Sequence, residues 1–312
     1  MKKKLIVHFG MQRTGTTTIQ AVLNKNKGIL RSHGICYPKL FGLNDHVKIP
    51  WWLKNNKILP GDLVKEILKN DENIINTFVL SAEDFCLLKN YNFLNILKEI
   101  FDLHVVVYLK EQSSWLESWY NQHIKWPWDK KFSTATPQFF VDNIDDFYWI
   151  DYLSFLNNIQ GKIGSERLHV KAVAPGYVND TVKDLIEELG LNVEALHSYK
   201  HTNESLSAGQ LEVLRRVDLF DSSGRERANI LEALKSIDIE GDIYGKAVFT
   251  QKQIESIIDR YRVSNKKLFD EFFDSNQVFD ISSSRDITPI VISDDKVFKE
   301  YIPALCKVLA SR

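Results

Sequence analysis

The segment Gly10-Met11-Gln12-Arg13-Thr14-Gly15-Thr16-Thr17-Thr18 combines two glycines, one cation and four hydroxyl side chains. An apolar run precedes it and a helical pattern follows it. A glycine-rich turn in that setting can direct consecutive backbone N–H groups, and the positive end of the helix dipole, at a phosphate. Three consecutive threonines are poor helix formers, so a purely structural first turn does not explain them. We therefore predict that Arg13 and the stretch Thr14, Gly15, Thr16, Thr17 and Thr18 bind a phosphate group.

This segment differs from the phosphate loop of ordinary ATPases. It has the two glycines of the pattern GxxxxGK[ST], but Thr16 stands at the lysine position and Arg13 precedes Thr14-Gly15. A kinase of a small metabolite stays an alternative, with Thr17 holding Mg²⁺ and Glu83 or Asp84 assisting. A non-catalytic nucleotide-binding protein is a second alternative.

A second cation and hydroxyl follow another apolar run, Val105 to Leu109. Lys110 ends the predicted strand, and Ser114 and Glu117 have the spacing of a capping box, which predicts a helix that starts at Ser114. Ser118 would then lie in the opening turns of that helix. Lys110 and Ser118 are therefore expected to converge on one anion.

These two segments resemble the sulfotransferases that use 3′-phosphoadenosine 5′-phosphosulfate (PAPS). The family's first nucleotide loop, [KR]-[ST]-G-T-T, matches Arg13 to Thr17, and its 3′-phosphate site is an Arg at a strand end and a Ser eight positions later, a spacing that Lys110 and Ser118 reproduce. Family members more often have Lys at the position of Arg13 and Arg at the position of Lys110. Each exchange keeps the charge but changes the contact geometry. The resemblance implies a P-loop-type fold, PAPS as sulfuryl donor, 3′-phosphoadenosine 5′-phosphate (PAP) as product, and no required metal.

Later segments extend the resemblance to bacterial members that modify glycans. They are Val182 to Leu191, Asn203 to Ser207 and Ser264 to Leu268. The resemblance therefore implies a small-molecule or glycan acceptor, sulfated on a hydroxyl or amine. Asn203 and Ser205 either close over the nucleotide or cap a helix.

Sulfuryl transfer needs a general base, because the acceptor hydroxyl loses its proton as it attacks sulfur. Glu83 follows the apolar run Thr77 to Leu80, at a strand end that should open onto the ligand crevice. The family places a His or Glu at this strand end. His46, in a loop after Tyr37-Pro38, is the other candidate, since its ordinary pKa suits the task. We favour Glu83 as the general base and retain His46 as the second candidate.

Four tryptophans fall in Pro-containing segments that look like loops. Trp51, Trp52, Trp126 and Trp128 either stack on sugar rings or simply pack in the interior.

The elements that must position these residues alternate between strands and helices. The predicted strands are Leu5–Phe9, Thr77–Leu80, Val105–Leu109 and Leu168–Val173, and the predicted helices between them are Thr16–Asn26, Asp62–Lys69, Phe93–Phe101 and Thr181–Leu189. This alternation predicts an α/β fold with a doubly wound, mostly parallel sheet. After residue 204 helical patterns dominate, at Ala208–Leu219, Arg225–Ile237 and Gln251–Phe273. We predict an α/β core at 1–203 and a helical extension at 204–312, packed as one domain.

Composition limits the partners. Forty Lys and Arg oppose 41 Asp and Glu, and the resulting net charge of -1 gives no indication of nucleic-acid binding. The three cysteines, Cys36, Cys86 and Cys306, form neither a disulfide framework nor a zinc motif. The apolar run at the start is short and contains His8, and no stretch is long enough to span a membrane, so we expect a cytoplasmic protein. The acceptor's identity and the oligomeric state stay open.

Overall fold

A computed structural model of the chain describes residues 2–197, 206–237, 239, 248–273, 275, 278–279 and 291–311. The chain divides into two compact units. The first comprises Met1–Glu111, Trp149–Thr202 and Arg262–Ile281, and the second Gln112–Tyr148, Asn203–Tyr261 and Ser282–Arg312. The expected boundary between 203 and 204 stays a prediction. Asn203 and Ser205 lie outside the described residues.

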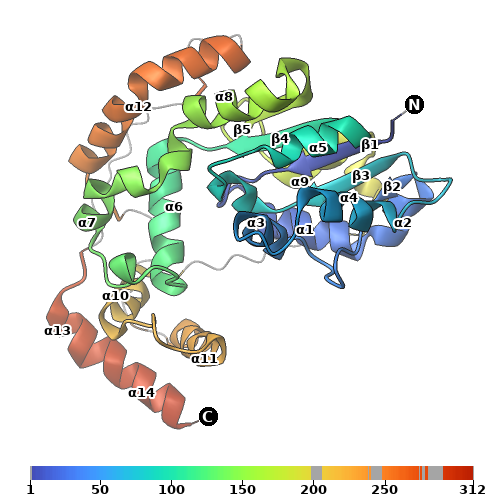
Figure 1. Cartoon of the computed structure of the whole chain (residues 1–312). Helices are drawn as coiled ribbons and strands as arrows, with labels where there is room; N and C mark the ends of the chain where they lie inside the picture. Colours follow the sequence, from blue (N-terminus) through green and yellow to red (C-terminus); the bar gives the residue numbers. More distant parts are fainter. Residues whose placement is uncertain are drawn as a thin grey trace. The chain divides into compact units, whose positions relative to one another are not determined.

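The first unit contains a five-stranded sheet with the order β2-β3-β1-β4-β5 (Figure 1). Its strands are β1 (Lys4–His8), β2 (Ile35–Cys36), β3 (Thr77–Ser81), β4 (Asp102–Leu109) and β5 (Leu168–Ala172). Every neighbouring pair is parallel, which confirms the predicted α/β class. The two-residue edge strand β2 was not predicted, because its only signal is Ile35-Cys36 between a turn and Tyr37-Pro38. In a parallel sheet, ligands bind beyond the carboxyl ends of the strands, so β1 and β3 point their ends toward the predicted site.

The helices of this unit are α1 (Thr16–Lys25), α2 (Lys27–Ser32), α3 (Lys48–Lys54), α4 (Pro60–Leu68), α5 (Phe93–Ile100), α8 (Tyr152–Ile163) and α9 (Thr181–Glu188). Four of them, α1, α4, α5 and α9, match predicted helices, and α2, α3 and α8 were not predicted. Shorter turns are η1 (Glu83–Leu87), η5 (Ser165–Arg167) and η6 (Val193–Ala195). Trp51 and Trp52 lie in α3, so the prediction of a loop there was wrong.

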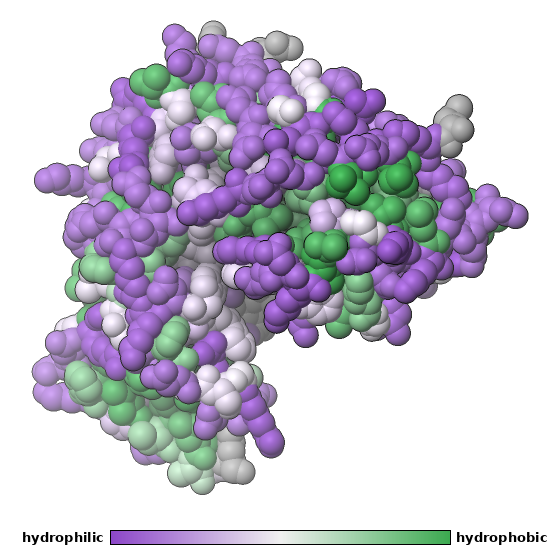
Figure 2. Space-filling view, viewed as in Figure 1, coloured by the Kyte–Doolittle hydropathy of each residue, from purple (hydrophilic) through white to green (hydrophobic). Residues whose placement is uncertain are grey.

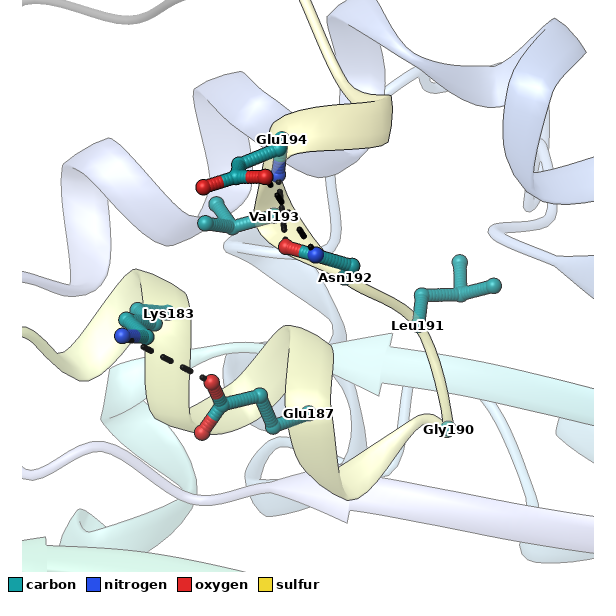
Figure 3. A pocket seen from close by; sticks show the side chains of 7 residues that line it. All are labelled: Lys183, Glu187, Gly190, Leu191, Asn192, Val193 and Glu194. Atoms are coloured by element: carbon teal, nitrogen blue, oxygen red, sulfur yellow. Dashed lines mark hydrogen bonds and ion pairs between the residues drawn. The ribbon is translucent and has the colours of Figure 1, made fainter.

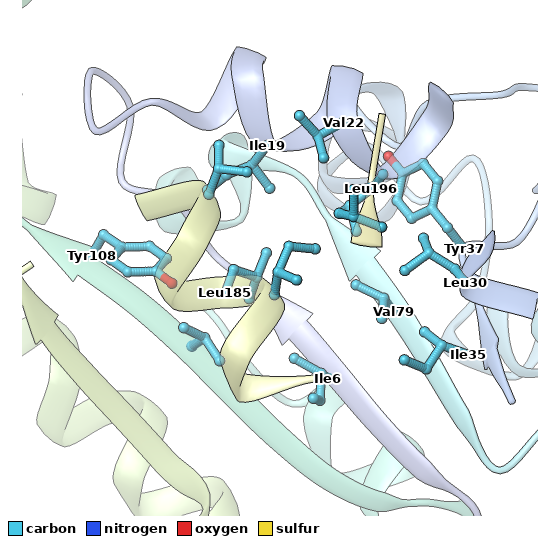
Figure 4. Close-up of a cluster of buried hydrophobic side chains, with 14 residues drawn as sticks. Ile6, Ile19, Val22, Leu30, Ile35, Tyr37, Val79, Tyr108, Leu185 and Leu196 are labelled. Atoms are coloured by element: carbon cyan, nitrogen blue, oxygen red, sulfur yellow. The ribbon is translucent and has the colours of Figure 1, made fainter. Parts of the chain in front are cut away.

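Apolar side chains cover both faces of the sheet. On one face, α1, α2 and α9 pack on alternate strand residues, with Ile19, Val22 and Leu185 against Ile6 and Val79 (Figure 4). On the other, α5 and α8 contact β4. Because side chains alternate along a strand, burial on both faces explains why the strands read as continuous apolar runs.

The described part of the second unit is helical. It contains α6 (Gln112–Lys125), α7 (Pro137–Asp142), α10 (Ala208–Val217), α11 (Gly224–Lys235), α13 (Asp294–Lys296), the π-helix η7 (Val297–Tyr301), α14 (Ile302–Ala310), and the turns η2 (Lys130–Phe132) and η3 (Ile144–Asp146). The turn η4 (Tyr148–Ile150) and α12 (Gln251–Phe272) have residues in both units. The helices α10, α11 and α12 match the three helical patterns predicted after residue 204. Among the described residues, no helix is both long and apolar enough to cross a bilayer.

The start of α6 corrects one prediction. The helix begins at Gln112, two residues before Ser114, and the Glu117 carboxylate accepts a hydrogen bond from the Val248 backbone N–H at 2.6 Å. The proposed capping box of Ser114 and Glu117 was therefore wrong, because Glu117 lies inside the helix and binds a distant segment. Ser118 still lies in the opening turns.

Gly209 in α10 gives a stability prediction. A Cβ at this position would overlap the ring of Tyr301, which is fully buried. Gly209→Ala should therefore lower the free energy of unfolding by ~1–3 kcal/mol, despite the better helix propensity of alanine. Gly224, in the first turn of α11, has open space around it. Gly224→Ala is the matched control, and thermal unfolding of both variants measures the difference; equal melting temperatures would contradict this packing.

Apolar surface gathers over α4 and α5 (Figure 2). Leu68, Ile96 and Ile100 are exposed there. Leu68 and Ile100 also line a hollow of about 420 Å³ with Lys2 and Lys3. Because Lys2 and Lys3 precede β1, this hollow lies at the amino edge of the sheet, opposite the predicted site.

Candidate active site

The loop after β1 is held by the neighbouring strand β4. The Met11 N–H donates to the Tyr108 carbonyl at 3.0 Å, and the Tyr108 N–H donates to the Gly10 carbonyl at 2.8 Å. Gly10 and Gly15 have φ angles of 95° and 89°, in the left-handed region that favours glycine. The loop thus passes over the carboxyl end of the central strand in one defined conformation.

The first turn of α1 follows immediately. Gly15 is its N-cap, without a side-chain cap, and Thr16 and Thr17 supply N–H groups that a helix leaves without intrahelical partners. The Thr14 hydroxyl closes the turn by donating to the Met11 carbonyl at 2.7 Å. These backbone groups and the helix dipole make the turn an anion-binding position.

Thr181, the first residue of α9, holds the same loop. Its hydroxyl donates to the Thr14 carbonyl at 2.9 Å, and a Cβ on Gly15 would lie 2.6 Å from the Thr181 oxygen. The sequence indicated a helix at Thr181 but not this contact, because only the fold brings residues 14 and 181 together. Thr181 is therefore a positioning residue that sequence reasoning missed.

Arg13 and Glu83 come from the ends of adjacent strands. Gly10 lies so close to Glu83 that a Cβ on Gly10 would be 3.0 Å from the Glu83 Cα. Burial lowers the pKa of the half-buried Arg13, and the Glu83 carboxylate opposes that shift. The structure therefore brings Arg13, the cation of the predicted phosphate loop, and Glu83, the favoured base, into one electrostatic environment.

Glu83 is held by two side chains of α1. It accepts hydrogen bonds from the Thr16 hydroxyl and from Gln20 Nε2, the latter at 3.1 Å. Burial raises the pKa of Glu83 and the nearby Asp84 carboxylate adds to that, while the bonds from Thr16 and Gln20 and the Arg13 charge oppose it. A carboxylate with a raised pKa is a stronger base. Gln20 was missed, although its spacing of four residues from Thr16 places both on one helix face.

His46 occupies a different kind of position. It is fully buried, its Nε2 lies 2.9 Å from the Pro38 carbonyl, and its Nδ1 accepts the Ser81 N–H at 3.2 Å. Burial lowers the pKa of His46 to about 4. Because both ring nitrogens contact backbone groups, the ring joins the loop after β2 to the end of β3. The choice between Glu83 and His46 as the base stays a prediction.

Lys110 and Ser118 belong to different units. Lys110 follows β4 in the first unit and is half-buried, and its carbonyl accepts a hydrogen bond from the Tyr152 hydroxyl at 2.7 Å. Ser118 lies in α6 of the second unit and is also half-buried. Their joint role in binding a 3′-phosphate stays a prediction.

A separate hollow of about 400 Å³ lies beside the C-terminal end of α9 (Figure 3). Lys183 pairs with Glu187 at 3.8 Å on one side, and Asn192 accepts the Glu194 N–H at 3.0 Å on the other. None of the predicted site residues lines it. Within the part of the chain that the structure describes, no group of three or more His, Cys, Asp or Glu side chains is arranged to hold a metal ion.

Comparisons with known proteins give two similarities. No protein-family model matches the chain. An uncharacterized protein of Archaeoglobus fulgidus is 30% identical over 217 residues, which are 65% of this chain and only 56% of that protein's length. The solved structure of retinol dehydratase, in complex with androsterone and the inactive cofactor PAP, aligns with 89% of this chain and 82% of its own at 12% identity. The TM-score of this alignment is 0.31.

Proposed function

We propose that this protein is a PAPS-dependent sulfotransferase whose acceptor is a glycan or another small molecule, acting in the cytoplasm. The observation that supports it best is the meeting of three groups at the carboxyl edge of the sheet. Arg13, the N-terminus of α1 and Glu83 lie at the ends of the adjacent strands β1 and β3. This arrangement puts an anion-binding turn beside a carboxylate of raised pKa.

In the proposed mechanism, Glu83 accepts the proton of the acceptor hydroxyl or amine. The acceptor atom forms a bond to sulfur while the bond from sulfur to the 5′-phosphate oxygen breaks in line. Arg13 and the N–H groups of Thr14 to Thr17 stabilise the charge that develops on that oxygen, which is the kind of preorganised interaction that contributes most to catalysis. The products are the sulfated acceptor and PAP.

The kinase alternative is weaker for a chemical reason. The Thr16 side chain, at the position of the phosphate-loop lysine, donates to Glu83. Threonine is uncharged, so this position supplies no cation of the kind that P-loop kinases direct at the transferred phosphoryl group. Turnover of PAPS distinguishes the proposed enzyme from a non-catalytic nucleotide-binding protein.

Nucleotide preference tests the proposal. PAP without metal should raise the melting temperature of the protein, because a ligand at about a hundredfold excess over its Kd stabilises the native state by about 2.7 kcal/mol. ATP with Mg²⁺ should stabilise less. A thermal-shift titration of both nucleotides measures the difference, and stabilisation by ATP with Mg²⁺ alone would favour the kinase.

The predicted 3′-phosphate contacts have their own test. Lys110→Ala and Ser118→Ala should each weaken PAP far more than adenosine 5′-monophosphate, because a hydrogen bond to a charged group contributes ~1.5–3 kcal/mol. Isothermal titration with both nucleotides gives the two Kd values for each variant. Equal losses for both would show that these residues support the fold instead.

A further inference from the structure

The helix α3 presents an exposed aromatic ring beside the proposed base. Trp51 is 38% exposed, and its Nε1–H donates to Asp84 Oδ2 at 2.7 Å. Asp84 follows Glu83 directly in the chain. The indole is therefore anchored by its polar edge to the residue next to the base, while part of the ring stays open to solvent.

The orientation of this ring is set from the buried side. Asp84 Oδ1 accepts a hydrogen bond from Gln12 Nε2 at 3.0 Å, and Gln12 Oε1 accepts one from Cys86 Sγ at 3.0 Å. Gln12 and Cys86 are buried, and Gln12 belongs to the loop that carries Arg13. Trp51 thus has a rigid attachment to the nucleotide loop, which is what a positioning surface for a second substrate requires.

The surface around Trp51 is also cationic. The Lys54 ammonium lies 5.0 Å from the centroid of the Trp51 ring, and Lys48 and Lys57 are exposed on the same segment. No acidic residue occurs between Asp45 and Asp62. The Asp84 carboxylate that holds the Trp51 indole is close enough for the Lys54 charge to act on it, so an aromatic ring and an exposed cation are combined on one surface above a half-buried carboxylate.

We propose that Trp51 and Lys54 form the acceptor subsite and that they bind an anionic sugar ring, such as a hexuronate. The ring's C–H face stacks on the indole, and its carboxylate meets the Lys54 ammonium. This inference rests on the proposed function, since it names the acceptor class for Glu83. A stacking aromatic with one nearby charge selects a sugar by shape and by the sign of its substituent.

Matched glycosides test it. We expect methyl β-D-glucuronide to bind the PAP-loaded protein about tenfold more tightly than methyl β-D-glucoside, because a charge-assisted contact separates the two. Ligand-observed NMR measures both Kd values. Lys54→Met should remove the difference while leaving the glucoside unchanged, and Lys65→Met, at an exposed lysine of α4, is the control that should preserve it.

Trp51→Ala should weaken both glycosides by about tenfold or more, as truncation of a contact tryptophan does. Trp51→Phe keeps a ring but loses the bond to Asp84, so its losses should be smaller. The proposal is overturned if the two glycosides bind equally, if neither binds, or if Trp51→Ala binds them as wild type does. It is also overturned if a neutral phenol, 4-methylphenol, is the one probe whose binding depends on Trp51. Titration of PAP without a sugar tests the proposed function separately. If PAP binds but the glycosides do not bind as expected, the result contradicts the acceptor subsite and leaves the proposed nucleotide binding intact.

Discussion

Glu83→Gln should lower the turnover of PAPS by ~10²–10⁴-fold, the usual contribution of a positioned general base. Glutamine keeps the shape of the side chain and can still accept a hydrogen bond from Gln20, but it cannot take the acceptor proton. The affinity for PAP should stay nearly unchanged. Steady-state kinetics and PAP titration on the same preparation separate the two effects. If Glu83→Gln stays active while His46→Gln does not, His46 is the base.

The pH dependence of the same reaction follows from the burial of Glu83. Because burial raises the pKa of Glu83, its basic form appears only at higher pH than for an ordinary glutamate, and kcat/KM, which reports the free enzyme, should rise with pH along a limb displaced upward. The limb should vanish in Glu83→Gln. A raised carboxyl pKa also means that the folded state binds this proton more tightly than the unfolded state does, so ionisation lowers stability as pH rises. Glu83→Gln should consequently melt no lower than wild type near pH 8.

Arg13→Met should lower kcat by ~10²–10³-fold, as expected when one donor to a developing oxyanion is removed. Arg13→Lys should lose less, because the charge remains while the fork geometry is lost. Arg31→Met is the matched control, since Arg31 on α2 pairs with Glu72 at an exposed position. Comparing kcat for the three variants measures the effect. If Arg31→Met lowers kcat as much as Arg13→Met does, the effect comes from the change in net charge and not from a contact of Arg13.

The sequence predicted the elements of the first unit well because its periodicity is strong. Four of the five strands and the helices α1, α4, α5 and α9 lie within a few residues of the predicted positions, since buried parallel strands read as apolar runs and these helices as amphipathic ones; α2 and α8 were not predicted. β2 was missed because two residues carry no periodicity. α3 was missed because Pro50 within it resembles a loop signal, although proline is tolerated in the first turn of a helix.

The candidate site was predicted in part. The loop and Glu83 were proposed from local spacing and strand ends, and the structure places them near each other, while their roles stay predictions. The roles of Thr181 and Asp84, and the burial of His46, depend on contacts between segments far apart in the chain. Thr181 lies 167 residues from its partner Thr14, and His46 lies 35 residues from Ser81. Spacing within one segment contains no information about such contacts.

The contact between Thr181 and Thr14 has a consequence for synthesis on the ribosome. The loop after β1 is synthesised before α9, and the Thr181 hydroxyl that holds it is added 167 residues after Thr14. At translation rates of about 5–20 residues per second, synthesis of the intervening residues takes on the order of ten to thirty seconds. The apolar strand β1 lies between β3 and β4 in the sheet, so it has neither neighbouring strand until both have been synthesised. The loop therefore gains its contact with α9 only after residue 181 has been added, and until β3 and β4 have formed, β1 is an apolar segment without its sheet partners.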